Sequence, residues 1–343
     1  MKNSIVKMQN VQVMDIARVK QEVFVLEGTT MIPATLSKNA NSLIAKIKPM
    51  EDWIVDCKGL RMGPIYYWYT DPLFNYYHLI LDGLGQLSHY FDLKREIPDL
   101  KLFLNQSPKA KSGCATHPPF VTELLDLFEI DYEFTDENIQ YDTVYFGDTL
   151  NQDARGKRVT PADRQYQLLH ELINRAKNTA SAPQHERVYL SRRASANPML
   201  NRKDVIGEDN TVKRGLVNED EVVEILSGLG YTEVFGENYT LAEKIVLFNG
   251  MKKYISAAGA GVTNILWTMP NSVSVGGIHT PGFPFPSNNH SRHICCNKKY
   301  VNATIDCYKG KVCFVDEAQG AKNYNSPWYI NNLDAFKEWA ATI

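Results

Sequence analysis

His78 and Asp82 lie four positions apart in a stretch whose apolar pattern predicts a helix. On a helix this spacing places both side chains on one face, where they can touch, and Gly85 and His89 continue the same stripe. A carboxylate beside an imidazole orients the ring and favours its protonated form, which suits removal of a proton from a hydroxyl group. The stripe therefore predicts either a catalytic base or a half-buried His-Asp pair that stabilises the helix.

A second candidate site is the glycine turn formed by Gly259, Ala260, Gly261, Val262 and Thr263. It follows an expected strand and opens an expected apolar helix. The unpaired amides and positive dipole end of such a helix attract phosphate, and glycine lets a ligand approach the backbone closely. Tight packing of strand against helix is the alternative, because the spacing falls short of the dinucleotide-binding fingerprint.

Arg192 and Arg193 come directly after an expected strand at residues 188–190. Two guanidinium groups can hold a diphosphate through paired hydrogen bonds, although an arginine pair after a strand is also typical of a solvated edge. Since the turn at Gly259 also follows a strand end, both features fall on the same side of the predicted sheet. Together they favour a ligand that carries a diphosphate.

A third group of residues could bind a metal ion. Its members are His290, His293, Cys295, Cys296, Cys307 and Cys313. Their spacing matches no common zinc motif, so free thiols or one local disulfide remain alternatives to a structural metal. We expect no metal at the catalytic site.

The elements that position these residues predict an α/β protein of two domains. Short strands are expected in residues 1–60, a long helix at 71–90, α/β alternation over 100–146 and a polar helix at 161–178. The small and polar stretch 179–184 is the best linker, which gives domains 1–180 and 181–326.

The second domain alternates strand and helix in the order β-α-β-α-β, from residue 188 to residue 275. Short crossovers of this kind imply a doubly wound parallel sheet with its ligand site at the carboxyl ends of the strands. A capping box is expected to start helices at Asn218 and at Thr240. The C-terminal segment 327–343 contains a short amphipathic helix.

Composition excludes several classes of protein. The 343 residues carry 37 Lys and Arg against 39 Asp and Glu, a formal net charge of −2. This balance argues against broad nucleic-acid binding, and no apolar run approaches the length of a membrane span. No secretory signal is recognised, and six Cys are too few for a disulfide scaffold, so the expected compartment is the cytoplasm.

Five stretches resemble glycosyltransferase family 61 and keep that family's order. They are residues 75–82 (N-Y-Y-H-L-I-L-D), 188–193 (V-Y-L-S-R-R), 218–223 (N-E-D-E-V-V), 241–244 (L-A-E-K) and 259–264 (G-A-G-V-T-N). The chain departs from the family at Ala258, where a histidine is usual, so it lacks that imidazole.

The resemblance implies a GT-B fold, in which two Rossmann-like domains face each other across an interdomain cleft. It also implies an inverting, metal-independent transfer from a nucleotide-sugar donor, a UDP-sugar of xylose type or UDP-GlcNAc, to a glycan or glycoprotein acceptor, with no cofactor. By position it assigns the arginine pair to the diphosphate, residues 259–263 to its oxygens, and Glu243 to the ribose, with a pure capping role for Glu243 as the alternative. Asn75, Tyr76 and Tyr77 border the acceptor side, and the C-terminal helix packs back on the first domain.

Two other functions are compatible with these residues. A nucleotide-sugar epimerase or hydrolase would turn over the donor without an acceptor. A catalytically silent sugar-binding subunit is the other alternative, and Ala258 favours it. Donor sugar, acceptor and linkage do not follow from the sequence.

Overall fold

A computed structural model describes residues 5–15, 23–27, 30–31, 55–62, 76–105, 118–135, 139–147, 163–193, 215–269, 272–279, 302–308, 312–314 and 328–343. The chain forms two compact units, Met1–Leu168 and Leu169–Ile343. The division falls within a helix, upstream of the stretch predicted as linker, and residues 180–186 have no helix or strand. Within the described ranges, no helix combines the length and apolar character needed to cross a membrane.

The first unit is built on a seven-stranded mixed sheet. In sheet order its strands are β3 (Thr30–Met31), β2 (Val23–Glu27), β1 (Ile5–Asp15), β7 (Ile139–Gly147), β4 (Val55–Met62), β5 (Lys101–Asn105) and β6 (Tyr132–Thr135). Strands β7, β4, β5 and β6 are parallel, whereas β1 to β3 add an antiparallel edge. This half-antiparallel sheet differs from the wholly Rossmann-like first domain that the resemblance implied.

Four helical segments of this unit are α2 (Tyr76–His78), the π-helical turn η4 (Leu79–Gly83), α3 (Leu84–Glu96) and α4 (Pro119–Leu127). The predicted helix at 71–90 is confirmed in part, because it continues to Glu96 and contains a π-helical turn. Residues before Tyr76 lie outside the described ranges. Helix α3 packs on β4 and β7, while α5 (Asp163–Thr179) confirms the predicted polar helix.

The second unit contains a five-stranded sheet whose strands are all parallel. The order is β12 (Asn302–Tyr308), β11 (Ser272–Ile278), β10 (Lys253–Ala257), β8 (Arg187–Leu190) and β9 (Thr232–Val234). Read from β9, this is the doubly wound order 2-1-3-4-5, and the strand order reverses between β8 and β10. The predicted doubly wound sheet is confirmed, and β12 adds a strand that we did not expect.

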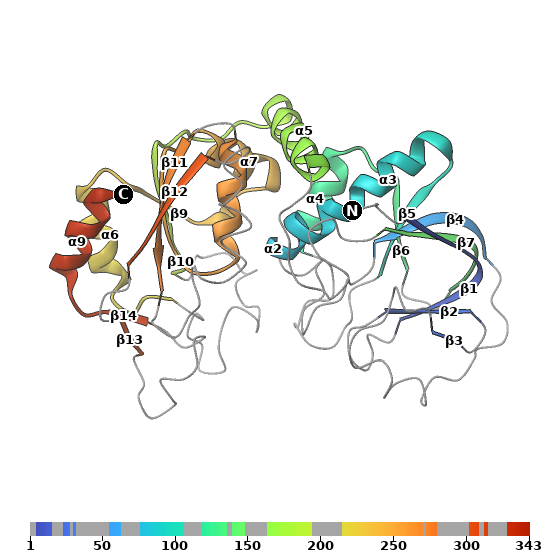
Figure 1. The fold of residues 1–343 in the computed structure, drawn as a ribbon. Helices are drawn as coiled ribbons and strands as arrows, with labels where there is room; N and C mark the ends of the chain where they lie inside the picture. Colours follow the sequence, from blue (N-terminus) through green and yellow to red (C-terminus); the bar gives the residue numbers. More distant parts are fainter. Residues whose placement is uncertain are drawn as a thin grey trace. The chain divides into compact units, whose positions relative to one another are not determined.

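Helices cover both faces of this sheet. Helices α6 (Glu219–Gly228) and α9 (Leu333–Thr342) lie on one face, and α7 (Leu241–Asn249) lies on the other (Figure 1). The described part of this unit also contains the 3-10 helices η6 (Gly236–Asn238) and η7 (Ala260–Thr268) and a small antiparallel pair, β13 (Val312–Phe314) and β14 (Trp328–Ile330).

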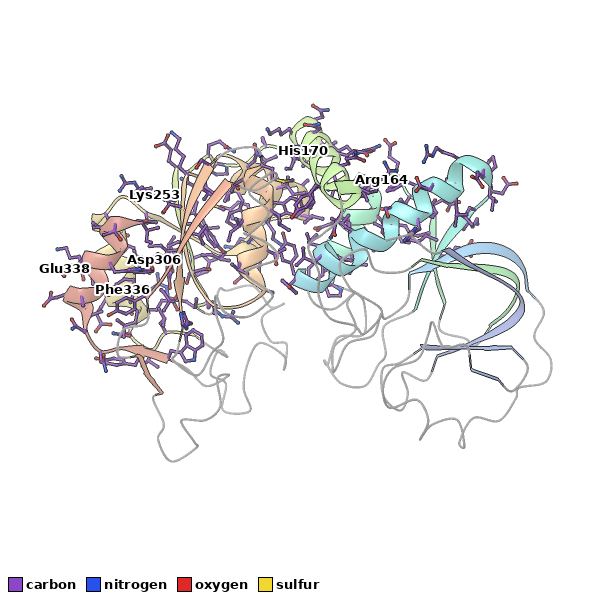
Figure 2. The ribbon with its side chains drawn as sticks, viewed as in Figure 1. Arg164, His170, Lys253, Asp306, Phe336 and Glu338 are labelled. Carbon is purple, nitrogen blue, oxygen red and sulfur yellow. The ribbon has the colours of Figure 1, made fainter. Side chains whose placement is uncertain are left out.

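The C-terminal helix α9 packs within the second unit. Its Phe336 is fully buried and stacks edge-on against Tyr308 of β12, and Figure 2 shows Phe336 on the inner side of the helix and Glu338 on the outer side. Trp339 lies so close to Gly276 of β11 that a Cβ at this glycine would be 2.8 Å from the indole. These contacts all lie within the second unit, and the expected packing of this helix on the first domain stays a prediction.

Candidate active site

The carboxyl ends of β8 and β10 bring the arginine pair and the glycine turn together. The two strands are hydrogen-bonded neighbours in parallel register, with Ser256 opposite Leu190. The chain leaves β8 through Ser191 and Arg192 and leaves β10 through Ala258 and Gly259, at the same edge of the sheet. This is the point where the strand order reverses, and open α/β sheets bind their ligands in the crevice at such a point.

Gly261 lets the glycine turn pack closely against the end of β8. A Cβ at this residue would lie 2.4 Å from Cδ2 of Leu190, the last residue of β8, so a methyl group there would displace that side chain. The packing interpretation of Gly261 is therefore confirmed. The absence of a side chain also places the backbone of the turn directly beside the strand that ends in Ser191 and Arg192.

The helix that follows the turn is η7, a 3-10 helix rather than the expected α-helix. Gly259, Ala260 and Gly261 are partly exposed, whereas Val262 and Thr263 are buried. Because the first amides of a helix have no partner within it, the exposed start of η7 presents donors at the sheet edge. The far end of η7 is held by Asn249 of α7, whose amide donates to the carbonyl oxygen of Trp267 at 2.6 Å.

Tyr254 links the arginine side of this edge to the turn. Its hydroxyl donates to the carbonyl oxygen of Gly261 at 2.9 Å. Burial raises the pKa of Tyr254, and hydrogen bonds with the side chains of Ser256 and Asn264 and the positive charge of Arg192 oppose that rise. The Tyr254 phenol thus stays protonated. Arg192 lies near enough to this tyrosine, at the base of the turn, for its charge to act on the phenol.

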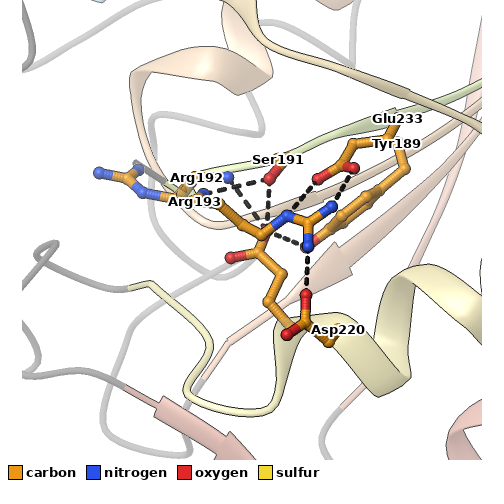
Figure 3. A network of polar contacts seen from close by, with 7 residues as sticks. Tyr189, Ser191, Arg192, Arg193, Asp220 and Glu233 are labelled. Atoms are coloured by element: carbon orange, nitrogen blue, oxygen red, sulfur yellow. Dashed lines mark hydrogen bonds and ion pairs between the residues drawn. The ribbon is translucent and has the colours of Figure 1, made fainter. Parts of the chain in front are cut away.

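Arg193 is held by carboxylates of its own unit. Its Nε lies 2.8 Å from Glu233 of β9, the guanidinium forms a second hydrogen bond to the same carboxylate, and a third goes to Asp220 of α6 (Figure 3). The Arg192 guanidinium points away from these carboxylates in the same view. The two adjacent arginines are therefore not equivalent.

A buried carboxylate, that of Glu219, supports the turn after β8. Its Oε1 accepts hydrogen bonds from the Tyr189 hydroxyl at 2.7 Å, from Ser191 Oγ at 2.7 Å and from the Arg192 backbone amide at 3.1 Å. Sequence patterns indicated no role for Glu219 beyond the start of a helix. The available signal was its position directly after the predicted helix cap at Asn218, close to a strand end.

The helix start at Asn218 differs from the predicted capping box. Asn218 makes no side-chain cap. Its amide instead pairs with both backbone groups of Ile330 in β14, donating at 2.9 Å and accepting at 3.1 Å. A partner more than a hundred residues away has displaced the local cap, which sequence alone could not reveal.

Glu243 confirms the other predicted capping box. The Thr240 amide donates to its Oε2 at 2.8 Å, and the Glu243 amide donates back to the Thr240 hydroxyl at 3.3 Å. The hydrogen bond from the Thr240 backbone is the main reason that the pKa of Glu243 is lowered. The capping role is thus present, and the ribose contact stays a prediction.

His279 is a residue at this edge that the sequence interpretation missed. It directly follows β11, is buried, and comes after Ile278, whose carbonyl oxygen accepts from the Ala258 amide at 2.9 Å. Its neighbour across the strands is therefore Ala258. A histidine immediately after a predicted strand was the available signal.

The stripe around His78 lies in the first unit and is only partly described. The side chains of His78 and Asp82, and all of Asn75, lie outside the described residues. Gly85 and His89 are buried, as are the apolar residues beside them. The single face expected from an uninterrupted α-helix is altered, because a π-helical turn winds more residues per turn.

The two tyrosines of this segment are at least partly buried. Tyr76 packs edge-on against Phe120 of α4, with ring centroids 5.6 Å apart, and Tyr77 is buried. Their role toward an acceptor stays a prediction. Of the six residues considered for a metal, Cys307 lies in β12 and Cys313 in β13, and the others are outside the described residues.

A family model for Glycosyltransferase 61 matches residues 76–275, more than half of the chain. The protein belongs to glycosyltransferase family 61. The match begins at α2 and ends within β11, so it includes the His78 segment, the arginine pair and the glycine turn. This glycosyltransferase uses a sugar donor and an acceptor. None of the curated proteins matches the chain.

Proposed function

We propose that this family 61 enzyme transfers a sugar from a UDP-sugar to a hydroxyl of a glycan or glycoprotein, with inversion at the anomeric carbon. The sugar would be a pentose such as xylose, or GlcNAc. The observation that carries the proposal is the convergence of Arg192 and the start of η7 where the strand order reverses. A guanidinium and helix amides at one sheet edge suit a diphosphate. The GT-B architecture with an interdomain cleft is part of the proposal.

In this mechanism the leaving diphosphate is stabilised without a metal ion or cofactor. Negative charge develops on the diphosphate as its bond to the anomeric carbon breaks. Arg192 and the amides of residues 259–263 supply positive charge that is already oriented, which is the most effective form of electrostatic stabilisation. Arg193 contributes by fixing the turn through Glu233 and Asp220, and Glu243 contacts the ribose.

The acceptor is activated by His78. Its imidazole takes the proton of the acceptor hydroxyl while that oxygen forms the new bond to the anomeric carbon, and Asp82 orients the ring. Attack opposite the departing diphosphate produces the inverted product. Asn75, Tyr76 and Tyr77 belong to the acceptor side.

Calorimetry with UDP tests the donor site. We expect Arg192→Ala to weaken UDP binding by about 1.5–3 kcal/mol, the scale of a hydrogen bond to a charged group, and to leave uridine binding unchanged. Arg193→Ala removes the anchor to Glu233 and Asp220 instead, so we expect it to lower the melting temperature and to weaken UDP binding less than Arg192→Ala does. Wild-type affinity for UDP in Arg192→Ala would refute this site.

A further inference from the structure

The burial of Glu219 needs an explanation beyond stability. Glu219 is the first residue of α6 and is only 3% exposed. Removing a carboxylate from water costs several kcal/mol, and well-packed apolar residues often stabilise a protein as much as a buried ionic group does. The positive end of α6 and three donors compensate the charge at this position.

All three of those donors come from one short segment, the end of β8 and the turn after it. Tyr189, Ser191 and the Arg192 amide donate to the same oxygen, Oε1. Burial raises the pKa of Tyr189 well above its usual value, and the nearby Glu219 carboxylate raises it further, so this phenol remains a donor. The Ser191 hydroxyl also accepts from the Arg193 amide at 3.1 Å.

Arg192 is therefore fixed from both sides. Glu219 holds its backbone amide, and the next residue is anchored through its guanidinium to Glu233 and Asp220. The backbone on either side of Arg192 has little freedom, and only its side chain extends from the network (Figure 3). A fixed backbone limits the positions that the Arg192 guanidinium can take, so less entropy is lost when the ligand arrives.

We propose that Glu219 is a positioning residue of the diphosphate subsite: it orients Arg192 toward the start of η7. This inference rests on the proposed function. It predicts that loss of Glu219 weakens the binding of a nucleoside diphosphate and leaves the binding of the nucleoside unchanged, because only the diphosphate meets Arg192.

The test compares the affinities for UDP and for uridine in the full chain. Glu219→Leu removes the acceptor, and we expect UDP to bind at least tenfold more weakly with uridine affinity unchanged. Glu219→Gln keeps an oxygen acceptor at this position without the negative charge, and should stay within about threefold of wild type. Glu221→Leu changes an exposed glutamate in the first turn of the same helix and serves as the matched control.

A purely structural role gives a different result. In that case Glu219→Leu lowers the melting temperature while the ratio of UDP to uridine affinity stays at the wild-type value, and the inference is overturned. If Glu219→Leu does not fold, Ser191→Ala and Tyr189→Phe each remove one donor and should each weaken UDP about 3- to 10-fold. An unchanged ratio of UDP to uridine affinity in both of these variants also overturns the inference. Wild-type protein that binds UDP no tighter than uridine would refute the diphosphate site itself, and this inference with it.

Discussion

At the scale of single residues, neighbours of identical chemistry have different roles. Arg192 and Arg193 both follow β8, but only Arg193 faces Glu233 and Asp220. The two side chains leave the turn after β8 in different directions (Figure 3). A substitution of Arg193 is therefore expected to disturb the fold around β9, whereas a substitution of Arg192 affects the ligand.

His78→Ala tests the proposed base. We expect kcat to fall by roughly 10²- to 10⁴-fold, the usual contribution of general acid-base catalysis, with UDP affinity nearly unchanged. Asp82→Asn should have a smaller effect in the same direction. Turnover and melting temperature are measured on the same samples, since a structural His-Asp pair predicts a lower melting temperature and normal turnover of the folded enzyme. Near wild-type transfer by folded His78→Ala would show that another group is the base.

At the scale of elements, the π-helical turn η4 depends on a distant side chain. The buried amide of Gln165 in α5 donates to the carbonyl oxygens of Ile80, at 3.4 Å, and of Leu81. A π-helical turn disturbs the regular hydrogen-bond ladder, and π-bulges are frequent at functional sites. Gln165 therefore stabilises the segment on which the proposed base lies.

Gln165→Leu should lower the free energy of unfolding by about 2–3 kcal/mol, because it leaves buried carbonyl groups without their donor. Gln167→Leu, an exposed position two residues along the same helix, is the control and should change stability by less than about 0.5 kcal/mol. Urea denaturation followed by circular dichroism measures both. Equal effects of the two substitutions would show that the contact to η4 contributes nothing specific.

At the scale of the whole molecule, the C-terminus belongs to the second unit. Trp339 of α9 packs on Gly276, and a Cβ at this glycine would also lie 3.0 Å from Ile255. We expect Gly276→Ala to destabilise the protein by about 1–3 kcal/mol, the usual cost of overpacking. Gly228→Ala is the control, because a Cβ there meets nothing within 4 Å, and replacing this helical glycine should be neutral or stabilising. Thermal unfolding of both variants distinguishes this docking from a loosely attached helix.

Activity of the intact enzyme in excess EDTA tests the absence of a metal requirement. Because Arg192 and the amides of η7 already supply positive charge to the diphosphate, we expect the transfer rate to be unchanged. The treated enzyme is then assayed again with Mg²⁺ or Mn²⁺. Loss of turnover that either ion restores would contradict the proposed mechanism.

Short-range sequence patterns predict most of the local elements of the second unit and their order. Strand β8, helix α7 with its capping box, and strand β10 with its glycine turn all follow from short-range patterns: apolar alternation, caps and turn residues. Because parallel strands with helical crossovers share one carboxyl edge, the arginine pair and the glycine turn could also be placed on the same side of the sheet.

Features that depend on partners far away in the chain are seen only in the folded structure. Asn218 caps no helix because Ile330 binds its amide, Arg193 is held by Glu233, and β12 becomes a strand by pairing with β11. The π-helical turn η4 likewise depends on a distant partner, the amide of Gln165. Local propensity is worth only tenths of a kcal/mol per residue, whereas a buried hydrogen bond left unmade costs about 1–3 kcal/mol, so the distant contact prevails.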